Sequence, residues 1–161
     1  VKEWYVALRP GELWFAATMM LEFAMRNGDI MRLKRDNFVE RDGRVFLNYT
    51  PRKTEHSSGR VVKWPVHPSI WAQMRTLFNG DDLPELDEAV FDELNAAMRG
   101  MGFTGTKGAY ELRKICVDHV YQKFGAEMAV SISGDDIRTI MHYYADPAQP
   151  NIDNIRVTDL I

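Results

Sequence analysis

Cysteine is almost absent from this sequence of 161 residues, in which Cys116 is the single example. One thiol excludes an internal disulfide and leaves no second cysteine for a metal site. Because so few cysteines are typical of a protein kept in a reducing compartment, we expect a cytoplasmic location.

Two further absences narrow the function. No apolar run approaches the roughly 20 residues needed to cross a bilayer, and nothing resembles a signal peptide, so no membrane association is expected. The sequence also lacks a glycine-rich phosphate loop, a Cys/His cluster and an Asp/Glu metal pair. We therefore expect neither a cofactor nor a metal ion.

Length and composition predict one globular domain over residues 1–161. A chain of this size with 45% hydrophobic residues can bury a sizeable core. It contains no internal repeat, low-complexity tract or linker that would indicate a second domain. The first residue is Val1 rather than Met, so we expect a piece of a longer protein.

Charge is unevenly distributed along the chain, whose formal net charge is −3. Residues 81–93 contain seven acidic side chains and no basic one, and without them the balance is +4. Residues 26–63 contain ten Lys/Arg against five Asp/Glu. Such a basic region can attract phosphate groups despite an acidic total. Charge alone favours the simpler interpretation, a solvated surface of mixed charge.

Apolar periodicity predicts a mainly α-helical chain. Residues 13–25 carry apolar groups around most of a helix, as expected of a helix at the centre of its domain. Asn27-Gly28 is expected to end this helix, and Asp29 to cap a short second helix that runs to Leu33. Further helices are expected over residues 68–78, 87–101, 109–124, 137–144 and 151–161.

A small sheet is expected between the second and third helices. Residues 37–39 and 45–49 flank Asp42-Gly43, a pair typical of the turn of a β-hairpin. Residues 60–66 predict a third strand that ends at its prolines. The sequence therefore predicts a mainly α fold with a small three-stranded antiparallel β-sheet.

Two segments of the sequence resemble motifs in the catalytic domain of the tyrosine recombinases, the phage-integrase family. Residues 23–33, FAMRNGDIMRL, are similar to the family segment T-G-x-R-x-S-E-x-x-x-L. The resemblance implies that Arg26 grips the scissile phosphate and that Asp29 supports the local structure. Residues 51–54, PRKT, resemble the lysine segment between the second and third strands. Lys53 would then be the general acid that protonates the leaving 5′-oxygen.

The third segment, residues 109–114 (AYELRK), resembles the family motif H-D-L-R-H. It implies that Arg113 is the second phosphate-binding arginine. Tyr110 stands where the family has histidine or lysine; its phenol can donate a hydrogen bond to a phosphate oxygen but is a poor proton shuttle near neutral pH. His119 and Gly125 match a further histidine and the glycine that ends the helix, and we interpret His119 as structural.

The fourth segment, residues 137–142 (IRTIMH), is similar to the family motif I-x-x-x-L-G-H. The resemblance implies that His142 donates to a non-bridging phosphate oxygen. The interval from Gly125 to His142 is a few residues longer than is typical of the family, which suggests an insertion near residues 130–134.

The chemistry that the resemblance implies is cleavage and rejoining of DNA strands. A tyrosine hydroxyl attacks a phosphodiester, forms a 3′-phosphotyrosine and frees a 5′-hydroxyl, while arginine and histidine donors stabilise the developing negative charge. The implied partner is double-stranded DNA, on which such proteins form homo-oligomers. Residues 151–161 are our candidate for the segment that subunits of the family exchange. Replacing Arg113 by alanine should remove phosphate stabilisation and leave the fold intact.

The nucleophilic tyrosine is not at the place that the family predicts. Counting on from His142 by the family's interval reaches Asn151, whose amide cannot form the covalent intermediate. Three explanations compete. The nucleophile lies beyond Ile161 or comes from a partner; or Tyr144 acts after a rearrangement, although it points away from His142 on an ideal helix; or cleavage has been lost.

Several functions remain open from the sequence. The first is a site-specific recombinase or integrase domain, with a telomere-resolving or transposon-type enzyme of the same chemistry close to it. The second is a catalytically inactive protein of the recombinase fold that binds DNA or takes part in assembly. The third is an unrelated helical interaction domain, in which the many methionines simply fill the core.

Overall fold

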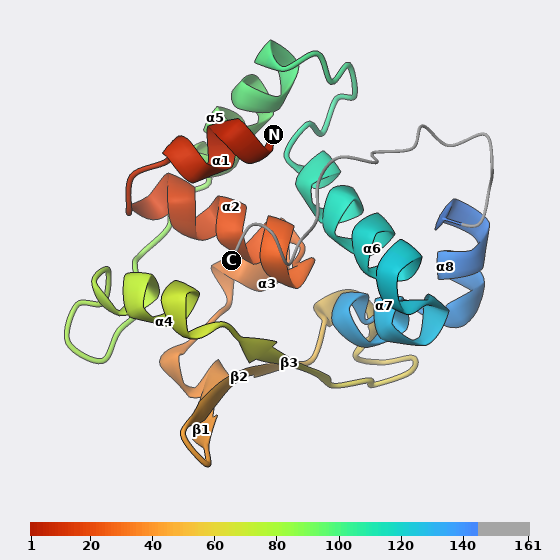
Figure 1. Cartoon of the computed structure of the whole chain (residues 1–161), viewed down its shortest axis with the longest axis horizontal. Helices are drawn as coiled ribbons and strands as arrows, with labels where there is room; N and C mark the ends of the chain where they lie inside the picture. Colours follow the sequence, from red (N-terminus) through yellow and green to blue (C-terminus); the bar gives the residue numbers. More distant parts are fainter. Residues whose placement is uncertain (145–161) are drawn as a thin grey trace.

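A computed structural model describes residues 1–144 of the chain, which form eight α-helices, two short 3₁₀ helices and three strands (Figure 1). In chain order these are α1 (Lys2–Ala7), α2 (Glu12–Phe23), α3 (Asn27–Met31), η1 (Arg35–Asn37), β1 (Phe38–Arg41), β2 (Arg44–Tyr49), η2 (Arg52–Thr54), β3 (Val62–Val66), α4 (Pro68–Arg75), α5 (Ala89–Gly100), α6 (Tyr110–Phe124), α7 (Ala126–Ser133) and α8 (Ile137–Tyr144). The predicted class, mainly α with a small sheet, is confirmed.

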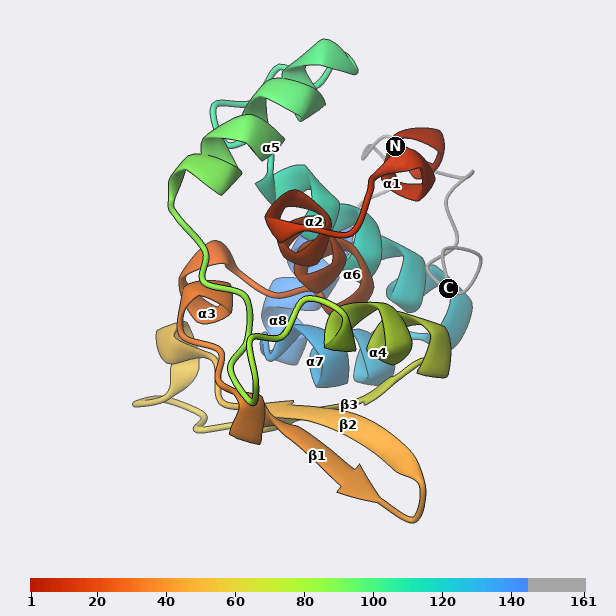
Figure 2. The same cartoon turned by 90° about the vertical axis from the view of Figure 1, so that its left-hand side faces the viewer.

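The three strands form one antiparallel sheet in the order β1-β2-β3 along one edge of the molecule (Figure 2). Asp42 and Gly43 make the first turn, with φ angles of 53° and 75°, which Asp and Gly tolerate better than other residues. Arg41 therefore lies opposite Arg44. The predicted hairpin and its Asp-Gly turn are confirmed.

Helix α2 lies at the centre of the domain, as its all-round apolar sequence predicts. Every residue from Trp14 to Phe23 is buried. It packs against α5 and α6, and the main hydrophobic core extends from it to the sheet and α4. Burial on all sides explains why this helix needs no polar face.

The end of α2 differs from the sequence prediction. The helix ends at Phe23, and Ala24 follows in the left-handed region with a φ of 52°. The expected breaker, Asn27-Gly28, instead lies at the start of α3. The Met25 N–H donates back to the Met19 carbonyl at 3.0 Å, and the Ala24 carbonyl accepts from Arg113. The end of α2 therefore depends on tertiary contacts, which the local sequence pattern does not predict.

Two helices were not predicted, α1 and α7. Helix α7 covers Ala126–Ser133, so the expected insertion near residues 130–134 falls on its last turn and on Gly134, which ends it in the left-handed region. The first half of α7 consists of strong helix formers, whereas Val130 and Ile132 weaken the helix signal of its second half. Packing of α7 against α6 and β3 stabilises it instead.

No helix within residues 1–144 is both long and apolar enough to span a membrane. Three sequence predictions lie outside the described residues. They are the loop at 146–150, the helix at 151–161 with its proposed exchange, and Asn151 as the family position of the nucleophile.

Candidate active site

Arg113 is the most deeply buried charged side chain in the described structure, with an exposed fraction of 1%. It projects from α6, where Nη1 donates to the Ala24 carbonyl and Nη2 donates to the Ser133 carbonyl at 3.3 Å. These bonds join the ends of α2 and α7 to α6. Burial alone lowers the pKa of the guanidinium, but Asp135 and Tyr110 outweigh it, and the pKa is raised above its ordinary value. Arg113 is therefore charged.

Arg26 and Arg113 bind the same carboxylate. Asp135 accepts from Arg26 Nη2 at 2.5 Å through one oxygen and from Arg113 Nη2 at 2.8 Å through the other. We call these three residues the arginine cluster. Two guanidinium groups around one carboxylate leave a net positive charge in a region from which most water is excluded, which is the electrostatic condition for holding an anion.

Asp135 is fixed by its backbone as well as by its side chain. Its N–H donates to the Ser133 hydroxyl at 3.1 Å, and its carbonyl accepts from Arg60 at 3.5 Å. Gly134, before it, has a φ of 69°, and a Cβ there would lie 2.6 Å from Pro51 Cγ. Only glycine brings the chain this close to the end of β2, so Gly134 determines where Asp135 lies.

Two buried polar atoms beside the arginine cluster have no hydrogen-bond partner. They are Arg26 Nη1 and the Tyr49 hydroxyl. Tyr49 ends β2 and is 8% exposed. Burial raises the pKa of its phenol, and the hydroxyl is within electrostatic range of Arg113, Asp29 and Arg26, whose charges also act on it. Buried donors without a partner in the protein are rare, and these two remain able to donate to a further acceptor.

Asp29 joins the Arg26 segment to the lysine loop. The buried carboxylate accepts from the Arg52 backbone N–H at 3.0 Å, which fixes the start of η2 against α3. Lys53 follows on η2 with an exposed side chain, between β2 and β3 as predicted. The loop is attached at its base, while the amine faces solvent.

Tyr110 opens α6 and is partly buried. Its ring centroid lies 6.0 Å from the Arg113 guanidinium carbon and 6.0 Å from Lys114 Nζ. The residue that departs from the family pattern thus lies beside the cluster, with its ring in cation–π range of two charges.

The predicted residues differ in how far they are buried. His142 lies on α8 with an exposed side chain, whereas Arg113 is buried and Arg26 is half-buried. Tyr144 is the last residue of α8 and of the described chain, and its side chain is outside the description. His119 lies on α6, one of the residues that line a separate pocket.

Sequence reasoning missed Asp135 and Tyr49. Asp135 and Asp136 both stand before α8, where an aspartate is typical of a helix cap, and Asp136 does cap α8, accepting from the Thr139 N–H at 2.8 Å. That backbone hydrogen bond lowers the pKa of Asp136. Tyr49 lies on the same buried face of β2 as Leu47. A tyrosine at such a position is expected to be part of the core, so the sequence does not indicate a function for it. Only the structure shows that its buried hydroxyl has no hydrogen-bond partner.

The basic and acidic regions of the sequence are not fully separated in space. Lys34 and Arg35 line the same surface hollow as Asp81, Asp82 and Glu85. Arg52, Lys53 and Arg60, in contrast, lie on the loop beside the arginine cluster and are exposed. The β2–β3 loop therefore presents three exposed basic side chains next to the arginine cluster.

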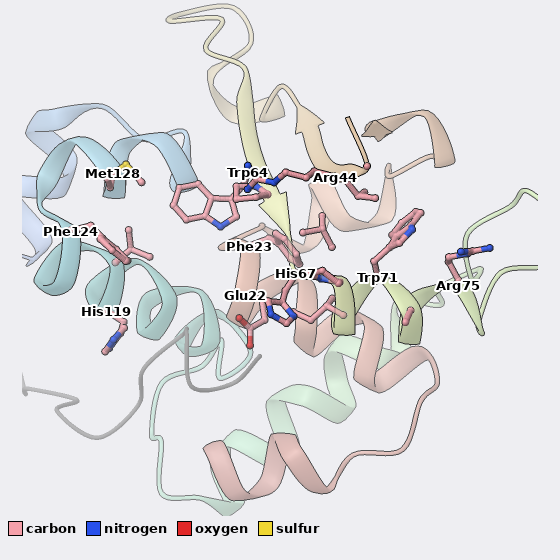
Figure 3. Close-up of a pocket in the computed structure, with 18 residues that line it drawn as sticks. Glu22, Phe23, Arg44, Trp64, His67, Trp71, Arg75, His119, Phe124 and Met128 are labelled. Atoms are coloured by element: carbon pink, nitrogen blue, oxygen red, sulfur yellow. The ribbon is translucent and has the colours of Figure 1, made fainter. Parts of the chain in front are cut away.

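An apolar pocket of about 600 Å³ opens on another part of the domain (Figure 3). Trp64, Trp71 and Phe124 contribute to its walls. Glu22 also lines it, 2% exposed, and neither of its carboxyl oxygens has a hydrogen-bond partner. Burial raises the pKa of Glu22 to about 8. Neither Arg26 nor Arg113 lines this pocket, so it is distinct from the arginine cluster.

Within residues 1–144 no group of three or more His, Cys, Asp or Glu side chains is arranged to hold a metal ion. Cys116, the single thiol, is fully buried, and burial raises its pKa.

No protein-family model and no curated protein matches the sequence. Solved structures do match. One is a XerH site-specific recombinase bound to its difH substrate in a pre-cleavage complex, with a TM-score of 0.67 and 14% identity over 90% of this chain. Another is XerH bound to a palindromic difH substrate in a post-cleavage complex, with a TM-score of 0.69 and 15% identity over 92% of this chain.

The chain spans 47% of the length of each of these XerH chains. At such low identity the match concerns the fold. Together with the helical architecture and the three-stranded sheet, it shows that this chain has a tyrosine-recombinase-like fold.

Proposed function

We propose that this chain is the catalytic-type domain of a site-specific recombinase or integrase, which binds double-stranded DNA and cleaves it through a 3′-phosphotyrosine. The observation that carries the proposal is the convergence of Arg26 and Arg113 on one carboxylate. These arginines come from distant segments of the sequence, and both were assigned to the scissile phosphate by resemblance. Their meeting at one anion supports a shared phosphate site.

The other predicted residues would complete the site in defined roles. Lys53 would protonate the leaving 5′-oxygen from its exposed position on η2, and Tyr110 and His142 would donate to phosphate oxygens. The hydrogen bond from the Arg52 N–H to Asp29 supports the role of Lys53, because it fixes the base of the lysine loop to the segment that carries Arg26. Tyr144 remains the candidate nucleophile within the described chain.

A covalent adduct tests this function. The protein is incubated with a nicked suicide duplex, from which the cleaved strand end diffuses away, and the products are separated on a denaturing gel. We expect a protein–DNA adduct, and peptide mapping of it identifies the attacking tyrosine. The matched control is Arg26→Gln, which should lower adduct formation by about a hundredfold or more. DNA binding without any adduct would contradict cleavage.

A second candidate is a catalytically inactive protein of the recombinase fold that binds DNA or takes part in assembly. Two observations favour it: a carboxylate already occupies the arginine pair, and a tyrosine stands at position 110. It predicts duplex binding with no adduct in the same assay. An unrelated helical interaction domain would bind no DNA even at low salt.

We further propose a setting consistent with this chemistry. The domain would act in the cytoplasm as a homo-oligomer assembled on DNA, without association with a membrane, and as part of a mobile element. Sedimentation of the protein with and without its duplex tests the assembly, since only the DNA-bound sample should exceed the monomer mass.

A further inference from the structure

We propose that Arg26, Arg113 and Tyr49 form an oxyanion site whose occupant in the DNA-free chain is the carboxylate of Asp135, and that a DNA phosphate enters by displacing it. The inference rests on the proposed function and adds a regulatory step to it. Asp135 would act as an internal competitor that occupies the donors of both arginines until DNA is bound.

Asp135 occupies the position expected of a bound anion. Each of its oxygens binds one arginine, at 2.5 Å from Arg26 Nη2 and 2.8 Å from Arg113 Nη2. A phosphodiester also presents two charged oxygens and one negative charge, so it can replace the carboxylate with little change in local charge. The two anions therefore compete for the same donors.

The fit of Asp135 is incomplete in a way that favours a larger anion. Arg26 Nη1 and the Tyr49 hydroxyl remain without partners although both are buried. The carboxylate is planar and its two oxygens are engaged by the arginines, whereas a phosphodiester is tetrahedral, with two charged non-bridging oxygens and two weaker ester acceptors directed to different sides. Phosphate can thus satisfy donors that Asp135 leaves unsatisfied.

The cluster lies close enough to the surface for exchange. The side chains of Arg26 and Asp135 are 13% and 11% exposed, while that of Arg113 is 2% exposed. The backbone of Asp135 is fixed by Ser133 and Arg60, and Gly134 is packed against Pro51. Displacement therefore needs only a rotation of the Asp135 side chain toward solvent, with Arg113 remaining in place.

Sulfate binding to the protein without DNA tests the exchange. Thermal unfolding is followed for the wild type and Asp135→Asn as sodium sulfate replaces sodium chloride at constant ionic strength, in the low millimolar range where general salting effects are small. We expect Asp135→Asn to melt lower in chloride and to bind sulfate at least about tenfold more tightly than the wild type, the effect of one charge-assisted hydrogen bond.

Asp136→Asn is the matched control, because it removes the same charge from the neighbouring exposed residue and keeps a side chain that caps α8. It should bind sulfate like the wild type. Tyr49→Phe, introduced into Asp135→Asn, should weaken sulfate binding again. Equal sulfate responses of the Asp135→Asn and Asp136→Asn variants would overturn the proposal. Should Asp135→Asn fail to fold, Asp135→Ser provides the same comparison.

A duplex titration separates this inference from the function on which it rests. Asp135→Asn should bind DNA more tightly than Asp136→Asn. Tighter sulfate binding without detectable DNA binding would support the oxyanion site and overturn the proposed DNA function. DNA binding of equal strength in the two variants, with equal sulfate responses, would support the function and overturn displacement of Asp135.

Discussion

Asp135 and Glu22 are both buried carboxylic acids, but their surroundings are opposite. Asp135 is bonded to two arginines, one at each oxygen. Glu22 lines an apolar pocket with neither oxygen paired, and burial raises its pKa to about 8. At the arginine cluster the carboxylate stays ionised because it is paired with two arginines. In the apolar pocket burial keeps the unpaired acid protonated near neutral pH. The comparison separates a site organised for anions from one organised for apolar groups.

The largest expected effect comes from breaking the paired region. Arg113→Ala removes the bonds to Ala24 and Ser133 and leaves Asp135 with one arginine. We expect the free energy of unfolding to fall by about 3–5 kcal/mol, as when one partner of a buried ion pair is removed. This revises the sequence-based expectation that the variant keeps its fold intact.

Urea unfolding at pH 7 measures this loss. The control is Arg99→Ala, which removes an exposed arginine from the last turn of α5 and should cost less than about 1 kcal/mol. A loss below about 1 kcal/mol in Arg113→Ala would show that its contacts do not hold the helix ends together.

Glu22→Gln probes the unpaired region through pH. Because the pKa of Glu22 is about 8 in the folded chain and 4.5 as its ordinary value, the wild type loses stability as the pH rises from about 4.5 to 8. At about 1.4 kcal/mol per pH unit, the total is a few kcal/mol. Glu22→Gln cannot ionise, so we expect the difference in stability between it and the wild type to grow over this range.

Unfolding measured from pH 5 to pH 9 tests the prediction, with the exposed Glu93→Gln as control. The control should follow the wild type at every pH. Parallel curves for Glu22→Gln and the wild type would mean that the Glu22 carboxyl is solvated or paired in solution.

Gly134→Ala tests whether the backbone before Asp135 determines where its carboxylate lies. The added Cβ meets Pro51 Cγ at 2.6 Å, and a φ of 69° is unfavourable for alanine. We expect a loss of about 1–3 kcal/mol and a weaker hold on Asp135. Gly28→Ala is the control, since Gly28 lies in α3 with open space around its Cβ position and has no positive φ. A neutral Gly134→Ala variant would contradict the fixed placement of Asp135.

The sequence predicted the parts of this fold that depend on local pattern. The all-round apolar character of α2 and the Asp-Gly turn each have a local physical cause. Helix α7 and the end of α2 could not be predicted in this way, because contacts with β3 and Arg113 determine them. Local pattern carries no information on such distant partners.

The candidate site divides in the same way. Arg26 and Arg113 were found through short motifs, and the structure places them at one carboxylate. The sequence did not predict Asp135 as their partner, because an aspartate just before a helix is usually interpreted as a helix cap. The lesson is that a motif can indicate which donors form a site, while its occupant depends on the tertiary fold.

The most direct test of the central claim is the salt dependence of duplex binding by the wild type and Arg26→Gln. We expect the wild type to bind at low salt, and Arg26→Gln to bind more weakly with a log–log salt slope reduced by about 0.9, the loss of one phosphate contact. The control, Arg9→Gln, changes an exposed arginine near α1 and should keep a slope closer to the wild type. Undetectable binding at low salt, or equal slopes for Arg26→Gln and Arg9→Gln, would contradict a phosphate site at the arginine cluster.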